Sequence, residues 1–276
     1  MIDTHAHIHE VVFDDDRDEA IRRANAAGVG KIITVGTSVA ESVDAVAAAE
    51  RYEEVLFAAV AVHPHEYSKM PERDVRLEWI KRLEEIAVRP KVVAIGECGL
   101  DYHAFNGVSV SEEQRNIQQE GFRDHLELAR RIGKPVVIHA RESYEDVLDI
   151  VRRYAEDIPS IVLHCYQGDK GVTQKFLDLS DNILFSFAGN ITYPVKKSIA
   201  GTKDDVRESI KVIPLERILT ETDCPYLAPQ KYRGARNEPA YVTEVAKKIA
   251  EIKGMPVEGV GLLTEKNAHR SFFQLS

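Results

Sequence analysis

The segment SEEQRNIQQEGFRDHLELARRIGKPVVIH, residues 111–139, combines one helix with one strand and indicates how the whole chain is built. Within 112–132, apolar side chains recur at three- and four-residue steps, as on one face of an amphipathic helix. Ser111 and Gln114 have the spacing of a capping box, and Gly133 stands where helices commonly end. The β-branched run that closes the segment predicts a short buried strand.

The same alternation runs from end to end of the 276-residue chain. Eight short apolar runs are predicted strands: 1–5, 31–37, 55–63, 91–97, 135–139, 161–164, 182–187 and 217–222. Amphipathic stretches between them predict helices, among them 39–51, 75–88 and 145–154. Because each crossover helix returns the chain to the same end, the strands should be parallel. The length suits a (β/α)8 TIM barrel of roughly 250 residues, with an open doubly wound sheet as the alternative. Without a linker or internal repeat, residues 1–276 are predicted to form one domain.

Composition limits the function classes. The formal net charge of −9 argues against broad electrostatic adhesion to nucleic acid or to an anionic membrane. It does not argue against a phosphate-bearing substrate, because bound metal cations can reverse the local potential. There is no apolar run of about 18 residues, no signal-peptide pattern at the N-terminus, and three widely spaced cysteines. These features predict a cytoplasmic protein with reduced thiols and without a membrane span.

Histidine and carboxylate side chains gather at the predicted strand ends. They are His5, His7, His63, His65, Glu97, His139, His164 and Asp223. In a parallel barrel the carboxyl ends of all strands meet at one rim, where catalytic residues collect. The sequence therefore predicts a single site at that rim.

The spacing of these residues predicts two metal ions. His5 and His7 alternate along a strand, so both project to one face, and two imidazoles with a carboxylate suit a divalent ion. His139 and His164, on adjacent predicted strands, can hold a second ion, with Glu97 placed to bridge the two. Such a carboxylate would hold the ions ~3.5–4 Å apart. Imidazole and carboxylate ligands suit Zn²⁺ or Mn²⁺ better than Mg²⁺.

Taken together, the blocks around these residues resemble the TatD family of metal-dependent hydrolases. They are IDTHAH (2–7), VHPH (62–65), GECGLDY (96–102), IHAR (138–141), LHCYQG (163–168), GNIT (189–192), TETDCPYLAP (220–229) and RNEP (236–239). The resemblance covers nearly the whole chain. It implies a TIM barrel and metal-dependent phosphodiester cleavage, as a DNase or a 3′–5′ exonuclease, with Mg²⁺ also allowed as the working ion.

Carried over position by position, the resemblance also implies a ligand set. His5, His7 and Asp223 would bind one ion, His139 and His164 the other, and Glu97 both. Two blocks depart from the family pattern without touching a ligand. His164-Cys165-Tyr166-Gln167-Gly168 stands where His-Cys-Phe-Ser-Gly is more common, and Ala140 stands where a cysteine often follows the histidine. Both differences concern substrate choice.

The remaining site residues are expected to act on the substrate. Asp223 is the candidate proton acceptor for the attacking water, because a carboxylate on strand eight would lie beside it. His63 and His65 are expected to contact phosphate or donate protons, since the metal positions are already filled. Arg141 and Arg236 are candidate phosphate clamps. Asp101 is expected to orient a ligand histidine.

The partner is therefore expected to be nucleic acid, at DNA ends, or another phosphodiester, with no membrane and no obligate protein partner. Two alternatives stay open. One is hydrolysis of an ester or amide, such as an aminoacyl-tRNA or an amidohydrolase substrate, although related barrels bridge their ions with a modified lysine where Glu97 stands here. The other is a non-catalytic metal-binding scaffold.

Overall fold

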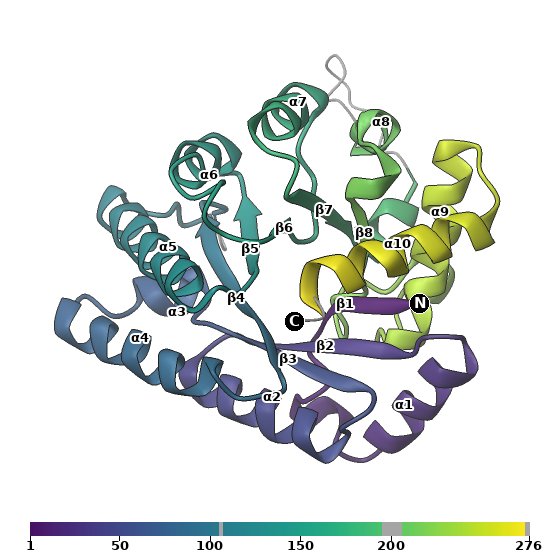
Figure 1. Cartoon of the computed structure of the whole chain (residues 1–276), viewed down its shortest axis with the longest axis horizontal. Coiled ribbons are helices and arrows are strands. Elements are labelled where there is room, and N and C mark those ends of the chain that lie inside the picture. The colour runs from purple at the N-terminus through teal and green to yellow at the C-terminus, as the bar shows by residue number, and fades with distance from the viewer. Residues whose placement is uncertain (105–106, 195–205, 274–276) are drawn as a thin grey trace. The chain divides into compact units, whose positions relative to one another are not determined.

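The computed structural model describes residues 1–104, 107–194 and 206–273, in which strands and helices alternate along the chain (Figure 1). The chain divides into two compact units. The first unit consists of Met1–Thr34 and Cys165–Ser276, and the second of Val35–His164. That residues 1–276 form one domain stays a prediction.

Every predicted strand is present in the described residues. The strands are β1 (Ile2–Ala6), β2 (Lys31–Gly36), β3 (Leu56–Val60), β4 (Val92–Asp101), β5 (Val136–Arg141), β6 (Ile161–Leu163), β7 (Ile183–Phe187) and β8 (Ile218–Thr220). The α-helices are α1 (Arg17–Ala26), α2 (Val39–Arg51), α3 (Pro64–Ser68), α4 (Arg73–Ala87), α5 (Glu112–Ile132), α6 (Tyr144–Val151), α7 (Lys170–Leu179), α8 (Val206–Val212), α9 (Val242–Lys253) and α10 (Val257–Phe272). No helix of the described part of the chain has the length and apolar character needed to cross a membrane.

In the first unit, the N-terminal strand lies beside the last strand of the chain. β7 pairs in parallel with β8, and β1 pairs in parallel with β2. A parallel bridge between Ala6 and Cys224 joins the end of β1 to the segment that follows β8. Helix α10 packs on both β1 and β8, and α9 packs on α10 (Figure 1). This arrangement brings residues near position 5 to residues near position 223.

The second unit contains the parallel pairs β3–β4, β4–β5 and β5–β6. The expectation that its second strand ends at Glu97 is wrong, because β4 continues to Asp101. Pairing with β5 resumes after a register shift and runs on to Asp101 opposite Arg141. Gly99 makes this close approach possible: its φ is +140°, and a Cβ there would lie 2.1 Å from the carbonyl oxygen of His139. Glu97 consequently lies within the irregular part of the strand.

The helix predicted from residues 112–132 is present with those bounds. Ser111 and Gln114 form the capping box, and Gly133 ends the helix in the left-handed conformation, with φ of +68°. Short helix α3 is absent from the sequence-based expectations. It begins at Pro64, where the fixed φ of proline suits a first helical position, and His63 is its N-cap.

Candidate metal-binding site

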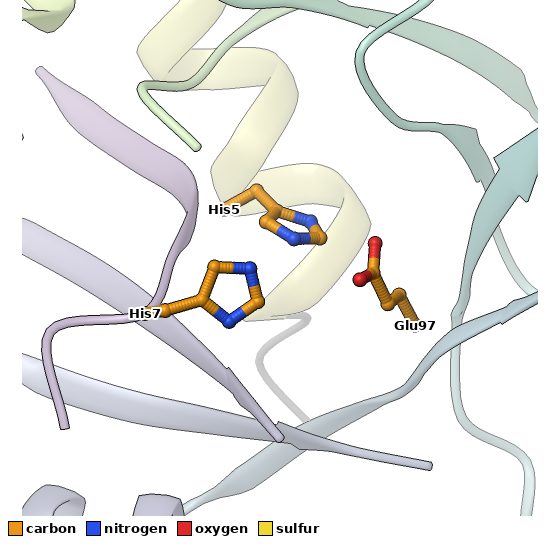
Figure 2. A group of neighbouring side chains, drawn as sticks. All are labelled: His5, His7 and Glu97. Atoms are coloured by element: carbon orange, nitrogen blue, oxygen red, sulfur yellow. The ribbon is translucent and has the colours of Figure 1, made fainter. Parts of the chain in front are cut away.

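The first unit brings three of the predicted ligands together. His5 lies within β1 and His7 just beyond it, and their rings pack edge to face with centroids 5.2 Å apart (Figure 2). Asp223 Oδ1 lies 3.8 Å from His5 Nε2 and 3.5 Å from His7 Nε2. Both histidines are buried, and the side chain of Asp223 is 15% exposed. Two imidazoles and a carboxylate facing one another form a donor set that suits a divalent ion.

The backbone holds this first cluster in place. The amide of Asp223 donates to the carbonyl of His5 (2.9 Å), and the amide of His7 donates to the carbonyl of Cys224 (2.7 Å). Asp223 has a φ of +56°, a left-handed conformation that aspartate tolerates better than most residues. Because the hydrogen bonds alternate between the two segments, the Asp223 carboxylate is fixed beside the histidines by main-chain geometry.

Two buried polar side chains support the segment around Asp223, and sequence reasoning missed both. Asp3 accepts hydrogen bonds from the amide (2.9 Å) and the hydroxyl (2.6 Å) of Thr222, and its burial raises the pKa of this carboxyl to about 8. Asn237 donates to the carbonyls of Thr222 (2.8 Å) and Tyr226 (2.6 Å). The available signals were weak: Asp3 shares its strand face with His5, and Asn237 lies in the quoted RNEP block.

The second unit places three histidines around Glu97, the residue drawn on β4 in Figure 2. His164 Nε2 lies 3.0 Å from Glu97 Oε2, His139 Nδ1 lies 3.7 Å from the same oxygen, and His63 Nε2 lies 3.8 Å from Oε1. The side chain of Glu97 is 7% exposed. His63, Glu97 and His139 each offer a ligand atom, all within 4.8 Å of one another. The Glu97 carboxylate with the imidazoles of His139 and His164 also forms a donor set that fits a divalent ion.

The carboxylate of Asp101 contacts two histidines, His139 and His65, through the Nε2 atom of each ring. Its Oδ2 lies 3.1 Å from Nε2 of His139 and 3.1 Å from Nε2 of His65, while Oδ1 accepts from the amide of His103 (2.9 Å). Burial raises the pKa of Asp101, but the hydrogen bonds from His139 and His65 outweigh this and hold the pKa well below its usual range. The side chain of Gln118 accepts a hydrogen bond from the backbone amide of Asp101 (2.8 Å) and donates one to its backbone carbonyl (3.0 Å).

These contacts determine which nitrogen of each ring is available. Nε2 of His139 is used by the Asp101 carboxylate, so Nδ1 is the nitrogen that faces Glu97. A partner carboxylate of this kind orients a metal-binding imidazole and makes it more basic. Sequence reasoning anticipated that Asp101 would orient a ligand histidine, but not that His65 would share the same oxygen.

His63 is held as a neutral donor. Its Nδ1 accepts the amide of His65 (3.2 Å), so in the neutral ring the proton resides on Nε2, toward Glu97. Burial, followed by the proximity of His139, lowers the pKa of His63 to about 3. A ring with this tautomer can donate a hydrogen bond from Nε2, but it cannot accept a proton there.

The two arginines expected to clamp phosphate differ. Arg141 is the last residue of β5 and its side chain is exposed. Arg236 is engaged in the first unit: its guanidinium donates to both carboxylate oxygens of Asp16, at 2.8 and 2.7 Å, and lies over the ring of Phe13. Glu221 is fully buried, and its Oε1 accepts the amide of Cys165 (2.6 Å), the residue after His164.

Three further histidines, which are not among the predicted site residues, contact residues outside the two clusters. His9 bonds to Thr34 through Nδ1 (2.8 Å), and His269 packs against Phe273. His125 is buried: its Nε2 accepts the amide of Val62 (3.1 Å), and Nδ1 lies 2.6 Å from the carbonyl of Gly121. Its pKa is lowered by burial.

The three cysteines are free, and two of them are buried. Burial raises the pKa of the thiols of Cys98 and Cys224. Cys165 is only partly buried, and the side-chain amide of Asn190 approaches its Sγ at 3.6 Å. A raised pKa keeps a thiol protonated, which suits a packing role for Cys98 and Cys224.

Comparisons with known proteins agree over nearly the full length of the chain. A sequence profile described as TatD-related DNase matches residues 2–273. A Bacillus subtilis protein named as the uncharacterized metal-dependent hydrolase YabD is 38% identical over 272 residues, covering 99% of this chain and 98% of the relative. The protein of Rahnella sp. (strain Y9602) named 3′–5′ ssDNA/RNA exonuclease TatD is 32% identical over 268 residues, covering 94% and 93%.

Solved structures give the same result for the fold. The crystal structure of YjjV, a TatD homologue from Escherichia coli K12, has a TM-score of 0.85 at 29% identity and covers 100% of this chain and 98% of that one. A TatD-family hydrolase from Entamoeba histolytica has a TM-score of 0.82 at 22% identity, covering 100% and 98%. The predicted (β/α)8 barrel is thereby confirmed, and the open doubly wound sheet is excluded.

Proposed function

Because the chain belongs to the family of TatD-related DNases, we propose that it is a nuclease that removes nucleotides from the 3′ end of single-stranded nucleic acid. The broader prediction of a metal-dependent hydrolase acting on phosphodiester bonds is confirmed by this membership. The observation that carries the finer proposal is the pair of donor clusters, around Asp223 and around Glu97. Both combine imidazole nitrogens with carboxylate oxygens.

We assign two divalent ions to these clusters. His5, His7 and Asp223 would hold one ion, His139 and His164 the other, and Glu97 would contribute to both. The support comes from the fold class, in which the carboxyl ends of all eight strands face one rim and catalytic side chains collect there. Zn²⁺, Mn²⁺ and Mg²⁺ are the candidate ions, and the imidazole-rich donor set favours the first two.

Ions bound at such a site supply Lewis-acid chemistry, lowering the pKa of water and neutralising charge on the phosphoryl oxygens. The residues of the chain do the rest. The carboxylate of Asp223, partly exposed beside His7, is the group positioned to accept the proton of the attacking water. His63 is the weaker candidate for this role, because its Nδ1 is occupied and its Nε2 carries the proton. We therefore assign His63 to hydrogen-bond donation toward the phosphate.

Substrate contacts follow the same reasoning. His65, with its side chain 30% exposed and anchored to Asp101, would contact the phosphate beside His63. Arg141 would approach the phosphate from the end of β5. Arg236 makes a two-fold hydrogen bond to Asp16, so we assign it to holding α1 and not to clamping phosphate.

The preference for single strands is argued from shape and charge. A recessed barrel rim admits a single strand end, whereas a duplex would have to fray to place its phosphate there. A chain with net charge −9 lacks the excess of cations that holds duplex DNA without such entry. The exonuclease named among the relatives acts on single-stranded DNA and RNA according to its name. We further propose a cytoplasmic location, supported by the three dispersed cysteines.

A substrate panel with metal replacement tests the proposal. Single-stranded DNA, closed duplex DNA, RNA and an aminoacyl-RNA would each be incubated with metal-stripped enzyme resupplied with Mg²⁺, Mn²⁺ or Zn²⁺. We expect shortening of the single strands from the 3′ end, faster than any cleavage of closed duplex. Release of the amino acid from aminoacyl-RNA without strand shortening would instead establish an ester hydrolase, and faster cleavage of closed duplex would contradict the single-strand preference.

A further inference from the structure

A cavity in the second unit lies outside both donor clusters. It is formed by the first turn of α2, the residue Val62 after β3, and helices α3 and α4, and its volume is about 570 Å³. Most of its wall is apolar and includes Val39, Val43 and Trp79. Ligand pockets commonly measure roughly 300–1,000 Å³ and combine an apolar wall with a few polar groups. This cavity has the size and the lining of a ligand site.

The backbone links this cavity directly to His63. Val62, in the cavity wall, precedes His63 in the chain, and Glu66 in the wall belongs to the helix that His63 caps. The amide of His63 also donates to the carbonyl of Thr37 (2.8 Å), the residue before Ser38 at the start of α2. A ligand in the cavity would therefore lie against the backbone that carries His63, the histidine that we assign to the scissile phosphate.

Trp79 gives the cavity a supported aromatic wall. It is the chain's one tryptophan, it is half-buried, and its ring packs edge to face on Tyr67 with centroids 6.0 Å apart. Tyr67 is itself fixed, since its hydroxyl donates to Asp124 (2.7 Å), which also pairs with Arg73. The half-buried indole lines the cavity, and every nucleobase offers a π-face on which such a ring can stack.

The polar groups of the lining favour a base over a phosphate. Glu66 and Glu78 both contribute carboxylates, against the single guanidinium of Arg82. Carboxylates repel phosphate and accept hydrogen bonds from N–H groups such as the exocyclic amines of adenine, cytosine and guanine. Glu66 forms an exposed ion pair with Lys69, and Glu78 forms one with Lys81. Exposed ion pairs are weak, so both carboxylates can still accept hydrogen bonds from a ligand.

We propose that this cavity binds a nucleobase of the single-stranded substrate, stacked on Trp79, next to the phosphodiester that His63 contacts. The inference rests on the proposed nuclease function and adds to it a base subsite. Because the base must leave its helical stack to enter, the subsite also favours single strands over duplex. Stacking on Trp79 tolerates any base, so it supports affinity without strict sequence preference.

Trp79 is also the reporter for the test. Full-length metal-loaded enzyme would be titrated with a phosphorothioate single strand, which resists cleavage, while tryptophan fluorescence is recorded. We expect saturable quenching, and none at the same concentrations with an abasic strand of equal length. Two variants keep the fluorophore and add the same charge. Val43→Glu lies in the cavity wall, and Leu77→Glu lies on α4 outside it, with similar exposures of 38% and 39%.

The expected result is a Kd for the strand raised about 5- to 150-fold in Val43→Glu, the range of one stacked base, with little change in Leu77→Glu. Absence of quenching, or equal effects in the two variants, would overturn the proposal. So would a wild type that forms a dimer in solution which Val43→Glu dissociates without a change in Kd. The last result would make this face a contact between copies. Cleavage of an unmodified strand by the wild type is measured in parallel. Quenching without cleavage would contradict the nuclease proposal alone, and cleavage without quenching would contradict the base subsite alone.

Discussion

The two donor clusters are held in place in different ways. Around Asp223, main-chain hydrogen bonds alternate between β1 and the segment after β8, so the backbone itself sets the positions of His5, His7 and the carboxylate. Around Glu97, a buried side chain orients the imidazoles, because the Asp101 carboxylate binds both His65 and His139. The position of the first cluster should therefore depend mainly on its backbone hydrogen bonds, and the orientation of His139 in the second should depend on a single carboxylate.

The largest effect should come from Asp223→Asn. The change is nearly isosteric and the backbone hydrogen bonds of Asp223 remain, so the cluster should keep its shape. It removes the negative charge and the proton acceptor, which matter most as the nucleophile forms. We expect kcat to fall ~10²–10⁴-fold with little change in KM, measured at saturating metal with occupancy checked. A variant that keeps its metal and more than about a tenth of the wild-type kcat would show that Asp223 is not the base.

The next effect tests the dependence on one carboxylate. Asp101→Asn leaves no charged acceptor for His139 and His65. Loss of such a partner typically costs 10–100-fold in metal affinity or activity. We expect metal affinity to fall by about that factor. Asp146→Asn is the control, since Asp146 accepts from the hydroxyl of Tyr102 at 2.8 Å and is not among the partners of Asp101. Equal metal affinities of Asp101→Asn and Asp146→Asn would show that the Glu97 cluster does not depend on the Asp101 carboxylate.

Much of this could be predicted from the sequence, because strand ends in a parallel fold converge. The predicted ligands His5, His7 and Asp223 do lie together, and so do Glu97, His139 and His164. What escaped prediction depends on local backbone irregularity. The extension of β4 to Asp101 needs the register shift next to Gly99, which no periodicity reveals.

Side-chain partners also escaped prediction. The side chains of Asp3 and Asn237 both bind Thr222, next to Asp223. Asp3 lies 219 residues away from Thr222 in the sequence, and Asn237 lies 15 residues away. Arg236 was expected at the phosphate, yet its guanidinium pairs with Asp16. A motif indicates which residues belong to a site, but not which partner each one takes.

The next prediction concerns the packing of helix α5 against Tyr67 and its effect on the free energy of unfolding. A Cβ added at Gly121 of α5 would lie 2.4–2.8 Å from the ring of Tyr67, which Asp124 holds in place. Gly121→Ala should lower the free energy of unfolding by about 1–3 kcal/mol. Gly259→Ala on α10 is the control: it meets no atom within 4 Å and should stabilise by roughly 0.5–1 kcal/mol. Denaturant unfolding checks both, and a stabilised Gly121→Ala would show that the Tyr67 ring can move.

The smallest effect concerns pH. Burial lowers the pKa of His125 below its usual value near 6.5, so the folded state keeps this ring neutral while the unfolded chain protonates it. The unfolded state then binds more protons below about pH 6.5, and stability falls as the pH drops through that window. His125→Gln, which can still accept from Val62 and donate to Gly121, should show a shallower loss between pH 7 and pH 5. Parallel stability–pH curves for both proteins would rule His125 out as the source.

The most direct test of two ions on two clusters is the metal content of matched histidine variants. Elemental analysis of dialysed, metal-reconstituted protein should give about two divalent ions per chain for the wild type and about one for both His5→Ala and His139→Ala. His269→Ala, on α10 and packed against Phe273, is the control and should keep the wild-type content. Thermal unfolding should be little changed, because rim ligands serve the site more than the stability of the barrel. Full metal occupancy in both His5→Ala and His139→Ala would contradict the account.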